Sequence, residues 1–119
     1  MNWYMAKVVF RIICGDGKHK SQFDEQLRLI YASDEKEAYE KAREIGFNEE
    51  DAFQNENKRM IEWRFIDVSE LHQVSALIDG AELYSKVIEI DQGDIYAELV
   101  KKRSAHIKAN IDNGVLQSF

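Results

Sequence analysis

Residues 4–14 read YMAKVVFRIIC, and the alternation in this stretch decides the fold. Every second residue of this stretch is apolar: Tyr4, Ala6, Val8, Phe10, Ile12 and Cys14. The residues between them include Lys7 and Arg11. A period of two is typical of a strand with one buried face. The stretch therefore predicts a strand whose apolar set faces a core.

A hairpin is predicted next. Residues 15–21, GDGKHKS, contain glycines and polar turn formers that return the chain antiparallel, and they lack the spacing of a phosphate-binding loop. Residues 22–32, QFDEQLRLIYA, then alternate again, with an apolar face that we expect to be buried: Phe23, Leu27, Leu29 and Tyr31. Glu25 lies on that same face, so it is expected at the solvent rim, in an ion pair or in a functional site.

A helix is predicted after this hairpin. Asp34 and Glu37 have the spacing of a capping box, with Ser33 as a competing cap. Small and apolar residues, Ala38, Tyr39, Ala42 and Ile45, form a stripe that suits packing on the hairpin, and Gly46 is expected to stop the helix.

The rest of the chain predicts further strands and a second helix. The clear alternation of residues 60–68 predicts a strand. A short strand and a turn are suggested before it, over residues 53–58. The segment that follows, residues 69–78, fits either a helix or a continuation of the strand. A turn at Asp79-Gly80 introduces a predicted strand over 81–90.

The last predicted element is an amphipathic helix over about 92–111, capped by Asp91 or Asp94. We expect one face of it to contact a second copy or another protein, through Ile95, Leu99, Arg103 and Ile107.

These elements predict an α+β fold: an antiparallel sheet of about four or five strands, one helix packed on a face, and a C-terminal amphipathic helix. We expect a single domain over 1–119, with 1–91 as the sheet and helix core and 92–119 as the C-terminal helix and tail.

Composition narrows the functional classes. The 119 residues carry 22 acidic and 16 basic side chains, a net charge of -6, which opposes general binding to nucleic acid or to an anionic membrane. The cationic residues near the end of the chain lack a recognised nucleic-acid motif. One cysteine forms no internal disulfide, and the sequence has no apolar run of membrane-spanning length, so a cytoplasmic location is expected.

The pieces of this sequence resemble an uncharacterised bacterial family catalogued as domain of unknown function 4288. The resemblance covers roughly residues 3–85, and it is carried by Trp3-Tyr4-Met5-Ala6-Lys7, residues 23–29, Glu37-Ala38 with Ala42, Trp63-Arg64-Phe65 with Val68, and residues 80–83. It implies a small α+β domain and carries no known reaction, cofactor or catalytic residue.

The residues show no catalytic signature, and we predict neither metal nor cofactor. The three histidines lie outside any nucleophile motif, and metal-binding spacings such as H-E-x-x-H are absent from the sequence. The candidate ligand site consists of charged and indole side chains: Trp3, Lys7, Glu25, Trp63 and Glu82.

Three functional hypotheses follow, of which the least favoured is nucleic-acid binding through the basic residues Lys101, Lys102 and Arg103. The leading one is a noncatalytic protein-interaction or self-assembly module whose partner is a second copy or another protein. The alternative is a small-ligand-binding protein or enzyme with its site around Glu25, Trp63 and Glu82.

Overall fold

The computed structural model describes residues 1–114. It divides into two compact units, Met1–Ser85 and Lys86–Phe119, and each unit is described by itself. Residues 115–119, the end of the predicted C-terminal tail, lie outside the described residues. The single domain expected over 1–119 stays a prediction.

Six helices and strands make up the described chain. In chain order they are β1 (Asn2–Cys14), β2 (Gln22–Ala32), α1 (Glu35–Asn48), β3 (Asp51–Gln54), β4 (Met60–Val74) and α2 (Gly93–Asp112).

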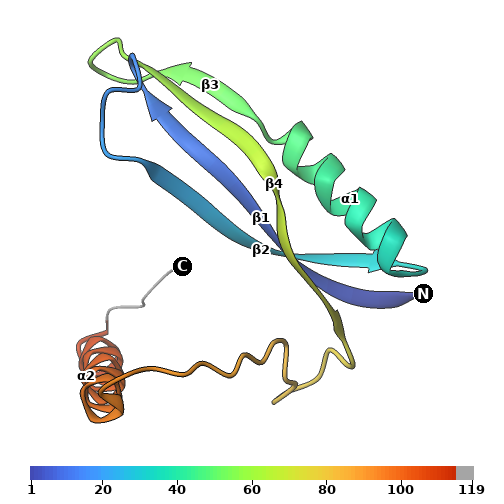
Figure 1. Cartoon of the computed structure of the whole chain (residues 1–119). Helices are drawn as coiled ribbons and strands as arrows, with labels where there is room; N and C mark the ends of the chain where they lie inside the picture. Colours follow the sequence, from blue (N-terminus) through green and yellow to red (C-terminus); the bar gives the residue numbers. More distant parts are fainter. Residues whose placement is uncertain (115–119) are drawn as a thin grey trace. The chain divides into compact units, whose positions relative to one another are not determined.

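The four strands form one antiparallel sheet in the order β2-β1-β4-β3 (Figure 1). β1 is therefore a central strand, paired with β2 on one side and β4 on the other. Tyr4 lies opposite Ile30 on β2, and Trp3 lies opposite both Tyr31 and Val74. This confirms the predicted α+β fold with an antiparallel sheet.

The core lies between the sheet and α1, which runs along one face of it (Figure 1). Tyr4, Ala6, Val8 and Phe10 are at most 2% exposed, so the predicted buried face of β1 is confirmed over these residues, whereas Ile12 and Cys14 are only half-buried. Ala38 and Ala42 are fully buried against this face. Their short side chains let the helix lie close to the strands and bury the apolar residues beneath it.

The start of α1 is confirmed, and its end differs from the prediction. The Asp34 side chain accepts a hydrogen bond from the Glu37 backbone N–H at 2.8 Å, while the Glu37 carboxylate bonds Ser33. The helix, however, continues through Gly46 to Asn48. The Phe65 ring lies where a Cβ of Gly46 would be, at 2.3 Å. Gly46 therefore serves close packing and does not stop the helix.

The later strands differ from the prediction in their bounds. β4 continues to Val74, so residues 69–74 extend the strand, and β3 occupies Asp51–Gln54 instead of 53–58. The turn between them is closed by the Asn55 N–H bond to the Arg59 carbonyl at 2.8 Å, with Lys58 at φ 61°.

The predicted strand over 81–90 is wrong, because these residues form no strand in the structure. A strand requires a neighbouring backbone to supply its hydrogen bonds. Alternation of side chains predicts a residue's preference for extended structure, and it does not guarantee that such a neighbour exists.

In the second unit, α2 forms as predicted to within a residue or two. Gln92 precedes it in the left-handed conformation, at φ 58°, and makes no side-chain cap bond, so neither Asp91 nor Asp94 is the cap. None of its residues is buried.

Candidate functional site

The exposed face of β2 is its apolar face. Phe23, Leu27, Leu29 and Tyr31 are 52%, 60%, 52% and 45% exposed, whereas α1 lies on the face that carries Ile30 and Ala32. The prediction that the apolar set is buried is therefore wrong. The register with β1 is the cause, since the buried residues of β1 lie opposite the even-numbered residues of β2. A one-residue difference in register decides which set faces the core.

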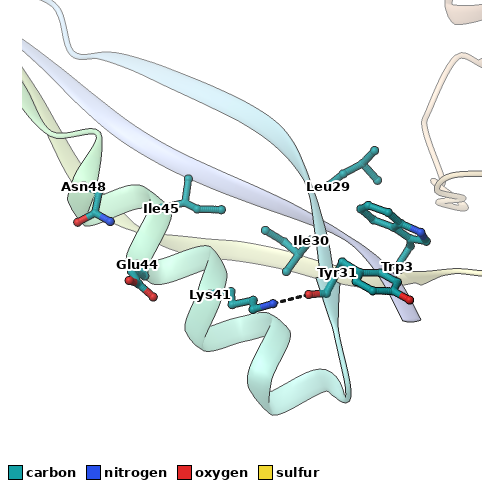
Figure 2. A pocket seen from close by; sticks show the side chains of 8 residues that line it. All are labelled: Trp3, Leu29, Ile30, Tyr31, Lys41, Glu44, Ile45 and Asn48. Carbon is teal, nitrogen blue, oxygen red and sulfur yellow. Dashed lines mark hydrogen bonds between the residues drawn. The ribbon is translucent and has the colours of Figure 1, made fainter. Parts of the chain in front are cut away.

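β2 is also an unpaired edge. It is the outermost strand, 11 residues long, and its register with β1 is continuous from Gln22 to Ala32. Lys41 Nζ donates to the Tyr31 carbonyl at 2.6 Å, which shows that this carbonyl points away from β1 (Figure 2). Backbone direction alternates along a strand, so the other odd-numbered residues of β2 also present N–H and C=O groups to the free edge.

The opposite edge of the sheet is less regular. β3 is only four residues long and pairs with residues 60–63 of β4, and beyond it the Glu50 carboxylate accepts the Phe65 N–H at 3.2 Å. The pairing of β1 with β4 is shifted twice, between Lys7 and Val8 and between Val9 and Phe10. Short strands and bulges discourage pairing with another chain. β2 has neither feature.

A polar row runs along β2 on the side of α1. Gln26 Nε2 donates to Asp24 Oδ2 at 2.6 Å, and Arg28 Nε donates to Gln26 Oε1 at 3.1 Å. Trp63 Nε1 donates to the same Asp24 oxygen at 3.2 Å, and Arg28 also pairs with Glu49. The row therefore reads acid, amide, cation along the strand.

A cavity lies between the C-terminal end of β2 and α1 (Figure 2). Its volume is about 470 Å³, within the range of small-ligand sites. The Trp3 and Tyr31 rings, 4.7 Å apart, form one wall with Leu29, and α1 contributes Lys41, Glu44 and Ile45.

A cluster of titratable side chains lies where β1 and β4 pair. Lys7 Nζ donates to Glu70 Oε2 at 2.7 Å, and the Tyr84 hydroxyl donates to Glu70 Oε1 at 2.8 Å. His72 Nε2 is 3.9 Å from the same carboxylate, and the His72 and Tyr84 rings are 4.6 Å apart. Glu70 thus binds two donors at once.

The hydrogen bonds in this cluster shift its titration. The bond from Lys7, followed by the bond from Tyr84, lowers the pKa of Glu70 below its usual value. The same bond to Glu70 raises the pKa of Lys7, with the charges of Glu70 and Glu25 acting in the same direction. The pKa of Tyr84 is raised, first by its bond to Glu70 and then by burial. The cluster therefore consists of an ion pair between Lys7 and Glu70, with the Tyr84 hydroxyl hydrogen-bonded to the same carboxylate.

The structure does not bring the five predicted ligand-site residues together. Trp3 packs on Tyr31, whereas Trp63 stacks on Phe53 with ring centroids 6.0 Å apart and packs against the core cluster beneath α1. Trp3 lies opposite Val74 and Trp63 lies opposite Ile12, so nine residues of β1, about 30 Å, separate the two indoles.

The three charged candidates lie around the Glu70 cluster, which includes His72 and Tyr84. Lys7 pairs with Glu70, and Glu25 is an exposed residue whose charge acts on Lys7. Glu82 is exposed beside His72 and Tyr84, at a shallow cavity of about 290 Å³.

The sequence reasoning missed Glu70, His72 and Tyr84. The signal was present in residues 70–74, where Glu70, His72 and Val74 continue the alternation of β4. Their partners became visible only with the register that places Lys7 opposite Glu70.

The predicted assembly residues of α2 are accessible. Ile95, Leu99 and Ile107 are 65%, 42% and 46% exposed, and Arg103 is exposed as well. Four-residue spacing places these side chains along one side of the helix.

Within 1–114, neither helix is long and apolar enough to cross a membrane. The same residues contain no group of three or more His, Cys, Asp or Glu side chains arranged to hold a metal ion.

The fold and the surface define a class: a small α+β domain in which one helix covers one face of a four-stranded antiparallel sheet. The family model described as Domain of unknown function (DUF4288) matches residues 3–85. The chain belongs to this family, and the match covers β1 to β4 and α1. No curated protein and no solved structure matches the chain.

Proposed function

We propose that this protein is a noncatalytic self-assembly module, and that the contact between copies is made through β2. One observation carries the proposal: β2 has a long, regular free edge, and its apolar side chains face solvent. Exposed apolar side chains beside unpaired N–H and C=O groups form a surface that another strand completes, because it supplies both apolar contact and hydrogen bonds.

A second copy is the occupant that the sequence of β2 favours. The strand carries an acid and a cation on one side and an alternating apolar set on the other, so it is complementary to itself when run antiparallel. Cytoplasmic location and bacterial origin belong to this proposal, supported by the lone cysteine and by the family resemblance.

Light scattering of the full chain tests the proposal. We expect a mass of twice the 13.9 kDa of one chain at tens of micromolar protein. Leu27→Glu combined with Leu29→Glu should give the monomer, because both substitutions place negative charge at the contact between two acidic copies. The control is Ile78→Glu, at a residue 71% exposed and outside β2, which should leave the mass unchanged.

A monomeric natural chain at these concentrations contradicts the proposal. The cavity lined by Trp3, Tyr31 and Lys41 would then be the stronger basis for function, as a small-ligand site.

A further inference from the structure

We infer that two copies pair β2 with β2 in one antiparallel register, with Asp24 of each copy opposite Arg28 of the other and Gln26 opposite Gln26 at the two-fold axis. This inference rests on the proposed function and deepens it, since it specifies the partner's residues.

The polar row provides the first argument. Asp24, Gln26 and Arg28 lie in line on the side of α1, joined by bonds of 2.6 and 3.1 Å. A two-fold copy of the row runs in the reverse order, cation, amide, acid. Sliding one row beside the other therefore places opposite charges face to face twice.

The free atoms of this row suit such pairing. Both bonds to Asp24 fall on Oδ2, and the bonds of Arg28 to Gln26 and Glu49 use Nε and Nη2. Asp24 Oδ1 and the N–H groups on Arg28 Nη1 are the atoms that an opposite copy would meet.

Backbone direction sets the second constraint. The Tyr31 carbonyl points to the free edge, so the odd-numbered residues supply the hydrogen bonds between copies and the even-numbered residues form the closer, non-hydrogen-bonded pairs. Because Lys41 already binds the Tyr31 carbonyl, the ladder between copies ends before that residue.

Neighbouring registers are less favourable. With Glu25 opposite Glu25, Asp24 opposite Asp24 or Arg28 opposite Arg28, like charges meet at the axis. With Leu27 opposite Leu27, Arg28 faces Gln26 and Phe23 faces Tyr31, whose carbonyl is occupied. The proposed register instead places Phe23 opposite Leu29 and joins both charge pairs.

Charge exchange tests the register. Arg28→Asp alone places two acids opposite each other at both pairs, and Asp24→Arg alone does the same with cations. We expect each single variant to weaken the dimer roughly tenfold or more. The variant with both substitutions restores opposite charges between copies, so dimerisation should return toward the natural level.

This rescue separates pairing from a purely structural role. Within one copy the double variant loses both the Arg28 bond to Glu49 and the Asp24 bond from Trp63. If these residues only supported the fold, the double variant would be worse than either single one. Absence of rescue with folded variants, judged by circular dichroism, overturns the inference.

Cross-linking gives a second, independent readout. In a Cys14→Ser background, Gln26→Cys places two thiols at the axis, in a non-hydrogen-bonded pair with Cα atoms about 4.5 Å apart, which suits a disulfide. We expect oxidation to give a covalent dimer. Gln22→Cys is the control, since Gln22 would face Ile30 of the second copy and form no such link.

The outcomes distinguish the two proposals. If the natural chain dimerises and Leu27→Glu with Leu29→Glu separates it, but Gln26→Cys does not cross-link, the proposed function stands and this register is wrong. Cross-linking by Leu27→Cys in place of Gln26→Cys would mean a shifted register and would overturn the inference. A natural chain that is monomeric overturns both.

Discussion

At the scale of the residue, Gly46 shows how a single missing side chain joins α1 to the sheet. The Phe65 ring occupies the space beside Gly46, and it also contacts Phe47 and Phe10 at centroid distances of 4.7 and 5.8 Å. A glycine inside a helix costs about 1 kcal/mol relative to alanine. Here that cost is offset by the burial of an aromatic ring that is 6% exposed.

Gly46→Ala should therefore destabilise the protein, although alanine is the better helix former. The added Cβ would meet three Phe65 ring carbons at 2.3–2.7 Å, and overpacking of this kind costs about 1–3 kcal/mol. We expect a net loss of up to about 2 kcal/mol in the free energy of unfolding, measured by urea denaturation, because the gain of about 1 kcal/mol in helix propensity offsets part of the overpacking. Gly93→Ala, with nothing within 4 Å of the new Cβ, should cost nothing.

The residues of β1 and those of β2 differ in how well sequence predicts their burial. On β1 one face is wholly apolar and the other is not, so Tyr4, Ala6, Val8 and Phe10 were correctly predicted to be buried, although Met5 on the other face is buried as well. On β2 the rule chose the wrong face, because α1 covers the side that meets Tyr4 and Ala6 across the sheet. The alternation of apolar residues within β2 contains no information about which face of the sheet α1, the helix that begins at Glu35, will cover.

At the scale of the element, the edge strands have unequal roles. β3 is short and its neighbouring backbone is bound by Glu50, whereas β2 has a long regular edge. The sequence predicted both hairpin strands correctly but not which strand would lie outermost, because the order of strands depends on pairing between distant segments. The self-association surface became visible only with that order.

Like β2, α2 has an apolar face that no other part of its own unit covers in the described residues. It has 20 residues, none of them buried in the described structure. Helical stability in such cases usually comes from packing of the apolar face.

If its predicted assembly face contacts a second copy, the helicity of α2 should rise with protein concentration. We expect the ellipticity per residue at 222 nm to increase on going from one to a hundred micromolar, roughly the range of weak dimers. Leu99→Ser should suppress this increase. Lys101→Ser, a similar change in helix propensity at a residue 75% exposed, should not. Equal behaviour of both variants would refute the contact.

At the scale of the whole molecule, charge is distributed unevenly. Residues 1–85 carry 17 acidic and 11 basic side chains, whereas residues 86–119 carry five of each. The net charge of the chain thus belongs to the unit that contains the sheet. Two copies brought together through β2 would repel at long range, so their association should strengthen as salt screens this repulsion.

Stability against pH follows from the Glu70 cluster. Because its pKa is lowered from 4.5, Glu70 contributes stability that is present above that value and lost as pH falls through its folded pKa. The pKa of Lys7 is raised from 10.5, so its contribution is present below that value and lost as pH rises through its folded pKa. The contribution of this cluster to the free energy of unfolding is therefore largest and nearly constant between about pH 5 and 10.

Glu70→Gln removes both the acid and the alkaline dependence of stability on pH that this cluster produces. We expect the variant to be less stable than the natural chain at pH 7 in urea denaturation, with the difference shrinking at pH 3. Glu82→Gln, the same chemical change at an exposed residue, is the matched control and should show little difference at either pH. A Glu70→Gln deficit that is as large at pH 3 as at pH 7 would show that the bonds to Lys7 and Tyr84 are not its cause.

The central position of β1 has a consequence for synthesis on the ribosome. β1 is translated first, yet its pairing with β4 waits until residue 74 has emerged. At about 5–20 residues per second, that interval lasts roughly 3–12 seconds after Cys14 is made. During it, a nascent hairpin of β1 and β2 presents two open edges. Neighbouring chains on one messenger RNA therefore meet at the stage when mispairing is easiest, and the arrival of β4 closes one of those edges.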